Sequence, residues 1–154
     1  MEVINTKLPT ILHVDDDDND HIFFNLAHRQ TKLPANIVAV SDGEQAIDYL
    51  DRKGDYADWE RAPMPSLVLL DLKLPRQSGF EILKWIRGKS QFDRMPVIIL
   101  SSSDEPSDKH RAFMMGADCY LVKPVSVSLL VEMVKYLHRI WLPRGRSKPH
   151  LAAA

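Results

Sequence analysis

Short apolar runs alternate with longer amphipathic stretches along most of the chain. The apolar runs are rich in Val, Ile and Leu and are nearly continuous, which is typical of strands covered on both faces of a parallel sheet. Polar and turn-forming residues bound each run. The pattern predicts five strands, at Ile11–Asp15, Ile37–Val40, Ser66–Asp71, Val97–Ser101 and Cys119–Val122.

The stretches between these runs have helical periodicity. In the last stretch, apolar residues recur at the three- and four-residue spacing that forms one face of a helix. Alternating strands and helices predict an α/β fold, a doubly wound five-stranded parallel sheet with five helices. The predicted helices are Asp18–Arg29, Gly43–Arg52, Gly79–Arg87, Glu105–Met114 and Ser126–Leu142.

The chain length of 154 residues suits one domain, which we place at residues 8–142. Residues 54–65, GDYADWERAPMP, are aperiodic and predict a long surface loop. Residues 1–7 and 143–154 are expected to be flexible termini, because the closing PRGRSKPHLAAA is basic and aperiodic. Residues 151–154 resemble a cloning scar.

Charge and composition argue against several classes of partner. The chain has 20 basic and 21 acidic residues and a formal net charge of −1, so no strong overall field attracts nucleic acid or an anionic membrane. No apolar run approaches the roughly 20 residues of a membrane-spanning helix. We therefore expect a cytoplasmic protein with neither partner. The lone cysteine, Cys119, lies in an apolar run and is expected in the core.

Polar residues gather where the predicted strands end. Asp15 and Asp16 follow the first strand, Asp71 closes the third, Ser101 closes the fourth, and Lys123 follows the fifth. In an open parallel sheet these ends share one edge, where ligands bind. Crowded carboxylates favour a hard divalent cation such as Mg²⁺. The ion, the ammonium and the hydroxyl together could neutralise a phosphoryl group on Asp71.

Each of these residues also has an ordinary structural explanation. Asp71 could cap a strand, Lys123 could be a solvated lysine, and Ser101 could belong to a polar loop. Asp17, Asp18 and Asp20 are better explained as acidic residues at a helix start, where the helix dipole favours them. The functional interpretation depends on one observation: the carboxylates, the hydroxyl and the ammonium that phosphoryl transfer requires occur together at four strand ends.

The segments LHVDDDDND, LVLLDLKLPRQSGFEIL, PVIILSSS and GADCYLVKP resemble, in order, the receiver domains of bacterial response regulators. The resemblance implies the flavodoxin-like, CheY-like fold with strand order 2-1-3-4-5. It also implies a phosphoacceptor rather than an enzyme in the usual sense, although such domains assist their own phosphorylation and dephosphorylation. The implied roles are Asp71 as phosphoacceptor, Asp16, Asp71 and the Lys73 backbone carbonyl as Mg²⁺ ligands, Asp15 as a ligand through water, Lys123 as phosphoryl contact, and Ser101 and Tyr120 as switch residues.

Three features resemble a subgroup of single-domain regulators paired with phytochrome-type histidine kinases. They are the extended 54–65 connection, the absence of an output domain, and the long last helix. Members of that subgroup often form homodimers through the face made by the fourth helix, fifth strand and fifth helix. Phe113, Met114 and Trp141 are the candidates for this face, and the alternative is a monomer in which they are ordinary packing residues.

Three other functions have some support in the sequence. A receiver-like scaffold could work without phosphorylation, although such versions usually lack residues that are present here. A magnesium-dependent aspartyl phosphatase could use Asp15 and Asp17, but it needs acidic metal ligands downstream of Lys123, where only Glu132 occurs. A calcium loop at residues 16–21 fails because His21 stands where the turn glycine is required.

Overall fold

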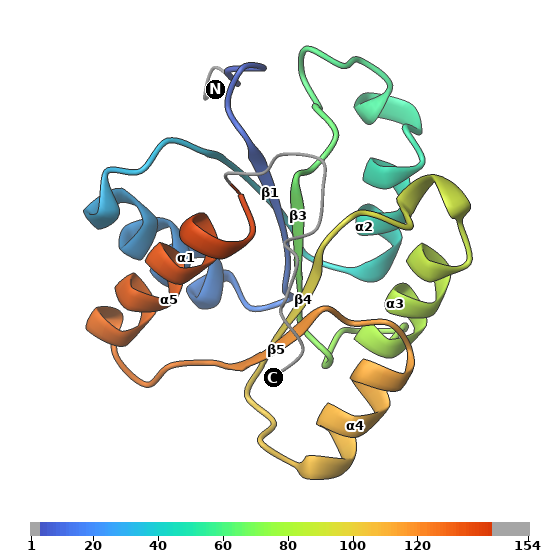
Figure 1. Cartoon of the computed structure of the whole chain (residues 1–154). Helices are drawn as coiled ribbons and strands as arrows, with labels where there is room; N and C mark the ends of the chain where they lie inside the picture. Colours follow the sequence, from blue (N-terminus) through green and yellow to red (C-terminus); the bar gives the residue numbers. More distant parts are fainter. Residues whose placement is uncertain (1–3, 143–154) are drawn as a thin grey trace.

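The computed structural model describes residues 4–142 and contains a five-stranded parallel sheet (Figure 1). The strand order is β2-β1-β3-β4-β5, which confirms the expected doubly wound topology. The strands are β1 (Thr10–Val14), β2 (Asn36–Val40), β3 (Leu67–Leu70), β4 (Val97–Ser101) and β5 (Cys119–Val122).

Five α-helices connect or follow these strands, as the sequence predicted. Their ends differ from the predicted ones by at most two residues, which is the usual uncertainty of helix termini. Side chains of Asp17, Asp42, Ser78 and Ser126 cap four of them at the N-terminus. The helices are α1 (Asp18–Thr31), α2 (Gly43–Leu50), α3 (Gly79–Arg87), α4 (Pro106–Met114) and α5 (Val127–Ile140).

The helices cover both faces of the sheet. In Figure 1, α1 and α5 lie on one side, and α2, α3 and α4 lie on the other. Because successive strand residues point to opposite faces, Ile11 joins the core under α1 and α5, whereas Leu12 joins the core on the opposite face. The sheet therefore separates two apolar cores.

Strand register brings four strand ends to one edge of the sheet. Val14 at the end of β1 pairs with Leu70 at the end of β3, and Ser101 at the end of β4 pairs with Val122 in β5. The residues that follow β1, β3 and β5 therefore emerge beside one another. This edge holds the predicted functional residues.

The environment of Trp141 corrects one prediction about the dimer face. Trp141 is only 2% exposed and belongs to the core between the sheet and α1 and α5. Its indole N–H donates to the hydroxyl of Tyr136 at 3.4 Å. Because the Trp141 side chain is buried by packing at the end of α5, it offers little surface to a second subunit.

Two further segments differ from expectation. The 54–65 loop contains a short 3₁₀-helix at Gly54–Tyr56, and the Tyr49 hydroxyl anchors the loop by donating to the Pro63 carbonyl at 2.7 Å. Near the N-terminus, Asn5 and Asn36 exchange hydrogen bonds of 3.2 and 2.8 Å, so the packed chain begins before residue 8. Residues 1–3 and 143–154, predicted to be flexible, lie outside the described residues.

Candidate functional site

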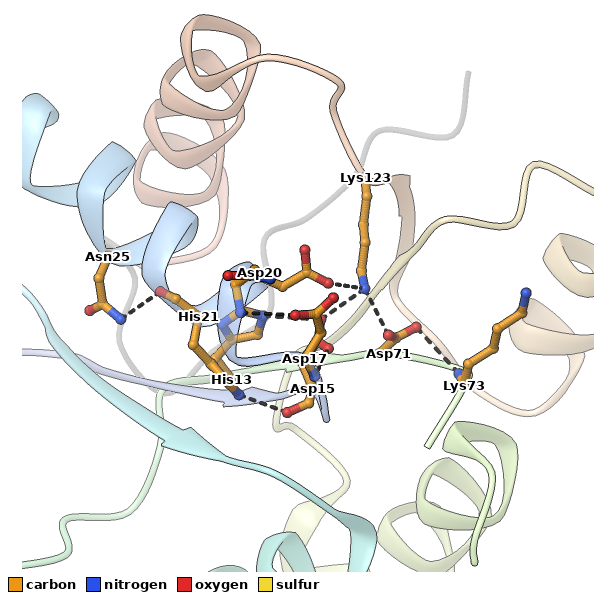
Figure 2. A network of polar contacts seen from close by, with 10 residues as sticks. His13, Asp15, Asp17, Asp20, His21, Asn25, Asp71, Lys73 and Lys123 are labelled. Carbon is orange, nitrogen blue, oxygen red and sulfur yellow. Dashed lines mark hydrogen bonds and ion pairs between the residues drawn. The ribbon is translucent and has the colours of Figure 1, made fainter. Parts of the chain in front are cut away.

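Lys123 lies at the centre of an acidic cluster at the carboxyl edge of the sheet (Figure 2). Its Nζ atom is 2.8 Å from Asp15 Oδ2, 2.8 Å from Asp71 Oδ2 and 2.6 Å from Asp20 Oδ2. The lysine backbone is positioned by its amide, which donates to the Ser101 carbonyl at 2.8 Å and extends the β4–β5 ladder. The side chains from β1, β3 and β5 therefore meet as the sequence predicted.

Asp15 and Asp71 are held at the site by their backbones. The Asp15 amide donates to the Val40 carbonyl at 3.1 Å, and the Asp71 amide donates to the Val14 carbonyl at 3.0 Å. Asp15 is fully buried and Asp71 is almost so, whereas Asp16 is exposed. The cluster therefore combines two buried carboxylates with one, that of Asp16, which faces solvent.

Burial and opposite charge set the protonation of this cluster. Burial, with some repulsion from Asp71, raises the pKa of Asp15 to about 6 despite contact with Lys123. Burial alone would lower the pKa of Lys123, but its three carboxylate partners outweigh that effect and raise it. The lysine stays charged at neutral pH. It is outnumbered by the surrounding carboxylates, so the site has a strong negative potential.

The cluster is suited to a hard divalent cation. Asp15, Asp16 and Asp71 each offer a carboxylate oxygen, and these oxygens all lie within 4.8 Å of one another. Opposite ligands of an octahedral Mg²⁺ ion lie about 4.2 Å apart, so the three acids fit such an ion with small side-chain adjustments. An ion would also offset the repulsion from Asp71, which adds to the effect of burial in raising the pKa of Asp15.

Asp20 is a member of the site that the sequence analysis assigned to the helix start. It does lie in the first turn of α1, but its carboxylate is within 2.6 Å of Lys123 Nζ. Burial tends to raise the pKa of Asp20, and contact with Lys123 more than compensates, so the pKa is lowered. Asp17 fits the predicted helix-start role, because its side chain accepts from the Asn19 amide as the cap of α1.

Close packing of α3 determines the position of the Asp71 backbone. The Gly79 amide donates to the carbonyl of Leu72, the residue that follows Asp71, at 2.9 Å. A Cβ atom at Gly79 would lie 2.1 Å from the Asp71 carbonyl oxygen, so only glycine fits there. The Lys73 amide donates to Asp71 Oδ1 at 3.3 Å. The sequence alone identifies Gly79 only as a helix start, because Asp71, its neighbour in space, is eight positions away.

A chain of hydrogen bonds connects the end of β4 to β5. The Ser101 hydroxyl is buried and accepts from the Ser103 amide at 3.2 Å. The Ser103 carbonyl in turn accepts from the Tyr120 hydroxyl at 2.8 Å, and the Ser103 hydroxyl donates to Asp108 of α4 at 2.6 Å. Tyr120 is half-buried and packs against the core. Ser101, α4 and β5 are therefore physically linked through one residue.

Two histidines under the acidic cluster were not predicted. The His21 Nε2–H donates to the Asp15 carbonyl at 2.7 Å, and the His13 ring lies 4.5 Å from the His21 ring between centroids. Burial, with a contribution from His21, lowers the pKa of His13 to about 3, so this ring is neutral. The apolar context of His13 in the sequence indicated only a buried strand residue.

The remaining candidates lie on α4, away from the acidic cluster. Phe113 is 51% exposed and Met114 is 75% exposed, so both are available to a partner surface. Within residues 4–142, no helix combines the length and apolarity required to cross a membrane.

Comparisons with known proteins identify the family of this chain. The response regulator receiver domain family matches residues 11–135. Response regulator Rcp1 from Synechocystis sp. is 30% identical over 132 residues, which cover 86% of this chain and 88% of Rcp1. The solved Mn²⁺-bound form of Rcp1 covers 88% of this chain and 95% of its own, with a TM-score of 0.76 and 30% identity.

A second solved structure is that of the phosphorylated cyanobacterial phytochrome response regulator RcpA. It has a TM-score of 0.80 and 33% identity, and the match covers 89% of this chain and 96% of RcpA. The receiver family is a signalling family of two-component systems, and RcpA is a phytochrome response regulator of this family. The sequence motifs, the sheet topology and the acidic cluster with its lysine thus have one explanation: the chain belongs to the response regulator receiver domain family.

Proposed function

We propose that this protein is a response regulator that accepts a phosphoryl group on Asp71 from a histidine kinase, with Mg²⁺ bound at the acidic cluster. The contact that carries the proposal is the 2.8 Å approach of Lys123 Nζ to Asp71 Oδ2 at the carboxyl edge of the sheet. It places a fixed positive charge beside the carboxylate that would attack phosphorus. Asp15, Asp16 and Asp71 are the residues that would hold the ion.

The chemistry is a single phosphoryl transfer. An Asp71 carboxylate oxygen forms a bond to phosphorus while the phosphorus–nitrogen bond of the donor phosphohistidine breaks, and the electron pair returns to the imidazole nitrogen. The bound ion supplies charge neutralisation for the phosphoryl oxygens. Lys123 exchanges part of its contact with Asp15 and Asp20 for a phosphoryl oxygen. The Ser101 hydroxyl donates a hydrogen bond to another oxygen.

The hydrogen bonds of Ser103 would connect phosphorylation of Asp71 to the surface formed by α4, β5 and α5. If the Ser101 hydroxyl turns toward a phosphoryl group, it gives up its hydrogen bond from the Ser103 amide. The Ser103 carbonyl is the partner of Tyr120, and the Ser103 hydroxyl is the partner of Asp108. Movement at residue 103 therefore changes the packing of the α4–β5–α5 face, which we propose as the output surface.

We also propose that the kinase is of the bacteriophytochrome type. Support comes from RcpA, which is described as a phytochrome response regulator and matches 89% of this chain. A panel of purified histidine kinases, phosphorylated with radiolabelled ATP, tests this pairing. A phytochrome-type kinase is expected to transfer label to this protein faster than unrelated kinases. Equal or slower transfer would contradict the pairing without affecting the role of Asp71.

The main test is phosphorylation by a small donor. Incubation with acetyl phosphate and Mg²⁺ should add one phosphoryl mass to the intact protein, and chelation of Mg²⁺ should prevent the gain. Asp71→Asn should abolish it, because the amide is not a nucleophile for this transfer. Asp93→Asn, which changes an exposed aspartate elsewhere, is the matched control and should gain the same mass as wild type.

A failure of wild type to gain mass would be examined with beryllofluoride, which mimics the phosphoryl group without turnover. Binding of beryllofluoride would indicate that the phosphorylated state forms but is short-lived. If the protein neither gains mass nor binds beryllofluoride, the result would instead favour a receiver-like scaffold that works without phosphorylation.

A further inference from the structure

A pair of histidines joins α1 to α5 away from the acidic cluster. His28 Nε2 and His138 Nε2 are 3.0 Å apart, and their ring centroids are 5.1 Å apart with an interplanar angle of 28°. The two residues are 110 positions apart in the sequence. The phosphorylation chemistry proposed above does not use either ring.

Both histidines occupy positions that favour a bound cation. His28 lies in the last turn of α1 and His138 lies in the last turn of α5. The carbonyl ends of two helices therefore converge on the pair, and the helix dipoles place partial negative charge there. A cation shared by the two rings would be stabilised by both helix ends.

The rings are in the protonation state that metal coordination requires. Burial lowers the pKa of His28, and burial together with the neighbouring His28 lowers the pKa of His138 to about 4. Both imidazoles are therefore neutral at pH 7, and each can present an Nε2 lone pair once its proton resides on Nδ1. No net proton release is needed for both nitrogens to bind one ion.

The nitrogen spacing indicates which ions fit. Two metal–nitrogen bonds of about 2.0–2.1 Å separate the nitrogens by about 2.9 Å at a right angle and by about 3.3 Å at the tetrahedral angle. The observed 3.0 Å is closer to the right angle, which is the geometry of tetragonal Cu²⁺ and Ni²⁺ sites. The nitrogens now face each other across a hydrogen bond, so binding requires both rings to tilt until the lone pairs meet at the ion.

We propose that His28 and His138 form a two-histidine site for a divalent transition-metal ion of the copper and nickel class, which clamps α1 to α5. Water reaches the pair from both sides, because His138 lines one surface cavity of about 480 Å³ and His28 lines another of about 390 Å³. Water molecules complete the coordination shell. Lys135 and Arg139 also line the first cavity, and their charges limit the affinity for a cation.

The test uses tag-free full-length protein in excess Mg²⁺, which occupies the acidic cluster. Titration with Ni²⁺ or Cu²⁺ is expected to show one site and to raise Tm by about 5–10 °C at a free-ion concentration 100 times Kd. The electron paramagnetic resonance spectrum of bound Cu²⁺ should show two imidazole nitrogens. This spectrum reports directly on wild type, so it decides the question even if a variant folds poorly.

Three variants complete the experiment. His28→Gln and His138→Gln should each remove the Tm increase and reduce the Cu²⁺ signal to at most one imidazole nitrogen. His110→Gln changes an exposed histidine on α4 and should behave as wild type. A wild-type spectrum with fewer than two imidazole nitrogens, or equal binding by wild type and both pair variants, would overturn the proposal and leave the pair as a proton-sharing hydrogen bond.

Discussion

At the scale of single residues, His13 links the acidic site to the pH dependence of stability. It is 2% exposed, and burial holds its pKa at about 3, against about 6.5 in an unfolded chain. Below pH 6.5 the unfolded state binds a proton that the folded state does not, so stability is lost as pH falls through this window. Asp15 has the opposite effect on stability. Because its pKa is raised in the folded state, the folded state binds a proton at a higher pH than the unfolded state does, which favours folding as pH falls.

The contribution of His13 is isolated by His13→Leu. Between pH 7 and pH 5, wild type is expected to lose about 2 kcal/mol more free energy of unfolding than the variant does. Urea denaturation at both pH values measures this difference, and the opposing effect of Asp15 is present in both proteins. Parallel pH profiles would show that His13 does not carry the dependence.

Gly79 is the residue whose backbone contact most directly positions Asp71. Gly79→Ala should lower the free energy of unfolding by about 1–3 kcal/mol, because the new Cβ would lie 2.1 Å from the Asp71 carbonyl oxygen. It should also slow phosphorylation by acetyl phosphate, since the acceptor must shift. Denaturant unfolding and intact-mass time courses measure the two effects.

Gly88→Ala is the matched control for that substitution. A Cβ at Gly88 would meet its nearest neighbour, the Lys84 carbonyl oxygen, at 3.4 Å, and the backbone there is helical with φ of −76°. Stability should be unchanged within about 1 kcal/mol. If both variants lost the same free energy of unfolding, the loss would come from alanine at either end of α3 in general and not from the contact with Asp71.

At the scale of secondary structure elements, α1 has an unusual exposed apolar surface beside the site. Ile22, Phe23 and Leu26 are 61%, 48% and 44% exposed. Phe23 also lines a cavity of about 220 Å³ that reaches Lys123. A protein that delivers a phosphoryl group must contact the rim of this site, whereas a small donor need not.

We therefore expect Phe23→Ser to slow transfer from the cognate histidine kinase about tenfold, equivalent to about 1.4 kcal/mol of lost contact. Phosphorylation by acetyl phosphate should be unaffected. Trp59→Ser, which removes an exposed aromatic from the 54–65 loop, should change neither rate. If Phe23→Ser slows both donors equally, the substitution acts on the chemistry and not on docking.

At the scale of the whole molecule, α4 offers a surface for self-association. Phe113 and Met114 form an exposed apolar surface on this helix, which is joined to Ser101 through Ser103 and Asp108. We expect beryllofluoride to shift the protein toward a dimer through the α4–β5–α5 face, measured by light scattering after size exclusion. Met114→Glu should prevent the shift by placing a charge in the apolar contact.

Ile22→Glu is the control for that experiment, because Ile22 is comparably exposed but lies on α1. It should still dimerise. An unchanged monomer in wild type with beryllofluoride bound would exclude self-association as the output. Loss of the dimer in Ile22→Glu would place the interface on α1 instead.

Much of the fold followed from local sequence patterns. The spacing of apolar residues shows whether a strand or a helix would bury them against the core. It therefore predicted all five strands and all five helices to within a few residues. Because parallel strands end at a common edge, the residues after them could also be grouped from their positions in the sequence. Asp15, Asp71 and Lys123 meet for this reason.

Tertiary structure alone decided contacts that depend on how distant side chains approach each other. Asp20 reaches Lys123 across 103 positions, and His28 reaches His138 across 110. The sequence left Trp141 as either a dimer contact or a packing residue, and the structure buries it. Periodicity in the sequence determines which face of an element is apolar, and it carries no information about the rotation and spacing of two packed elements. Those quantities determine which polar groups come within bonding distance.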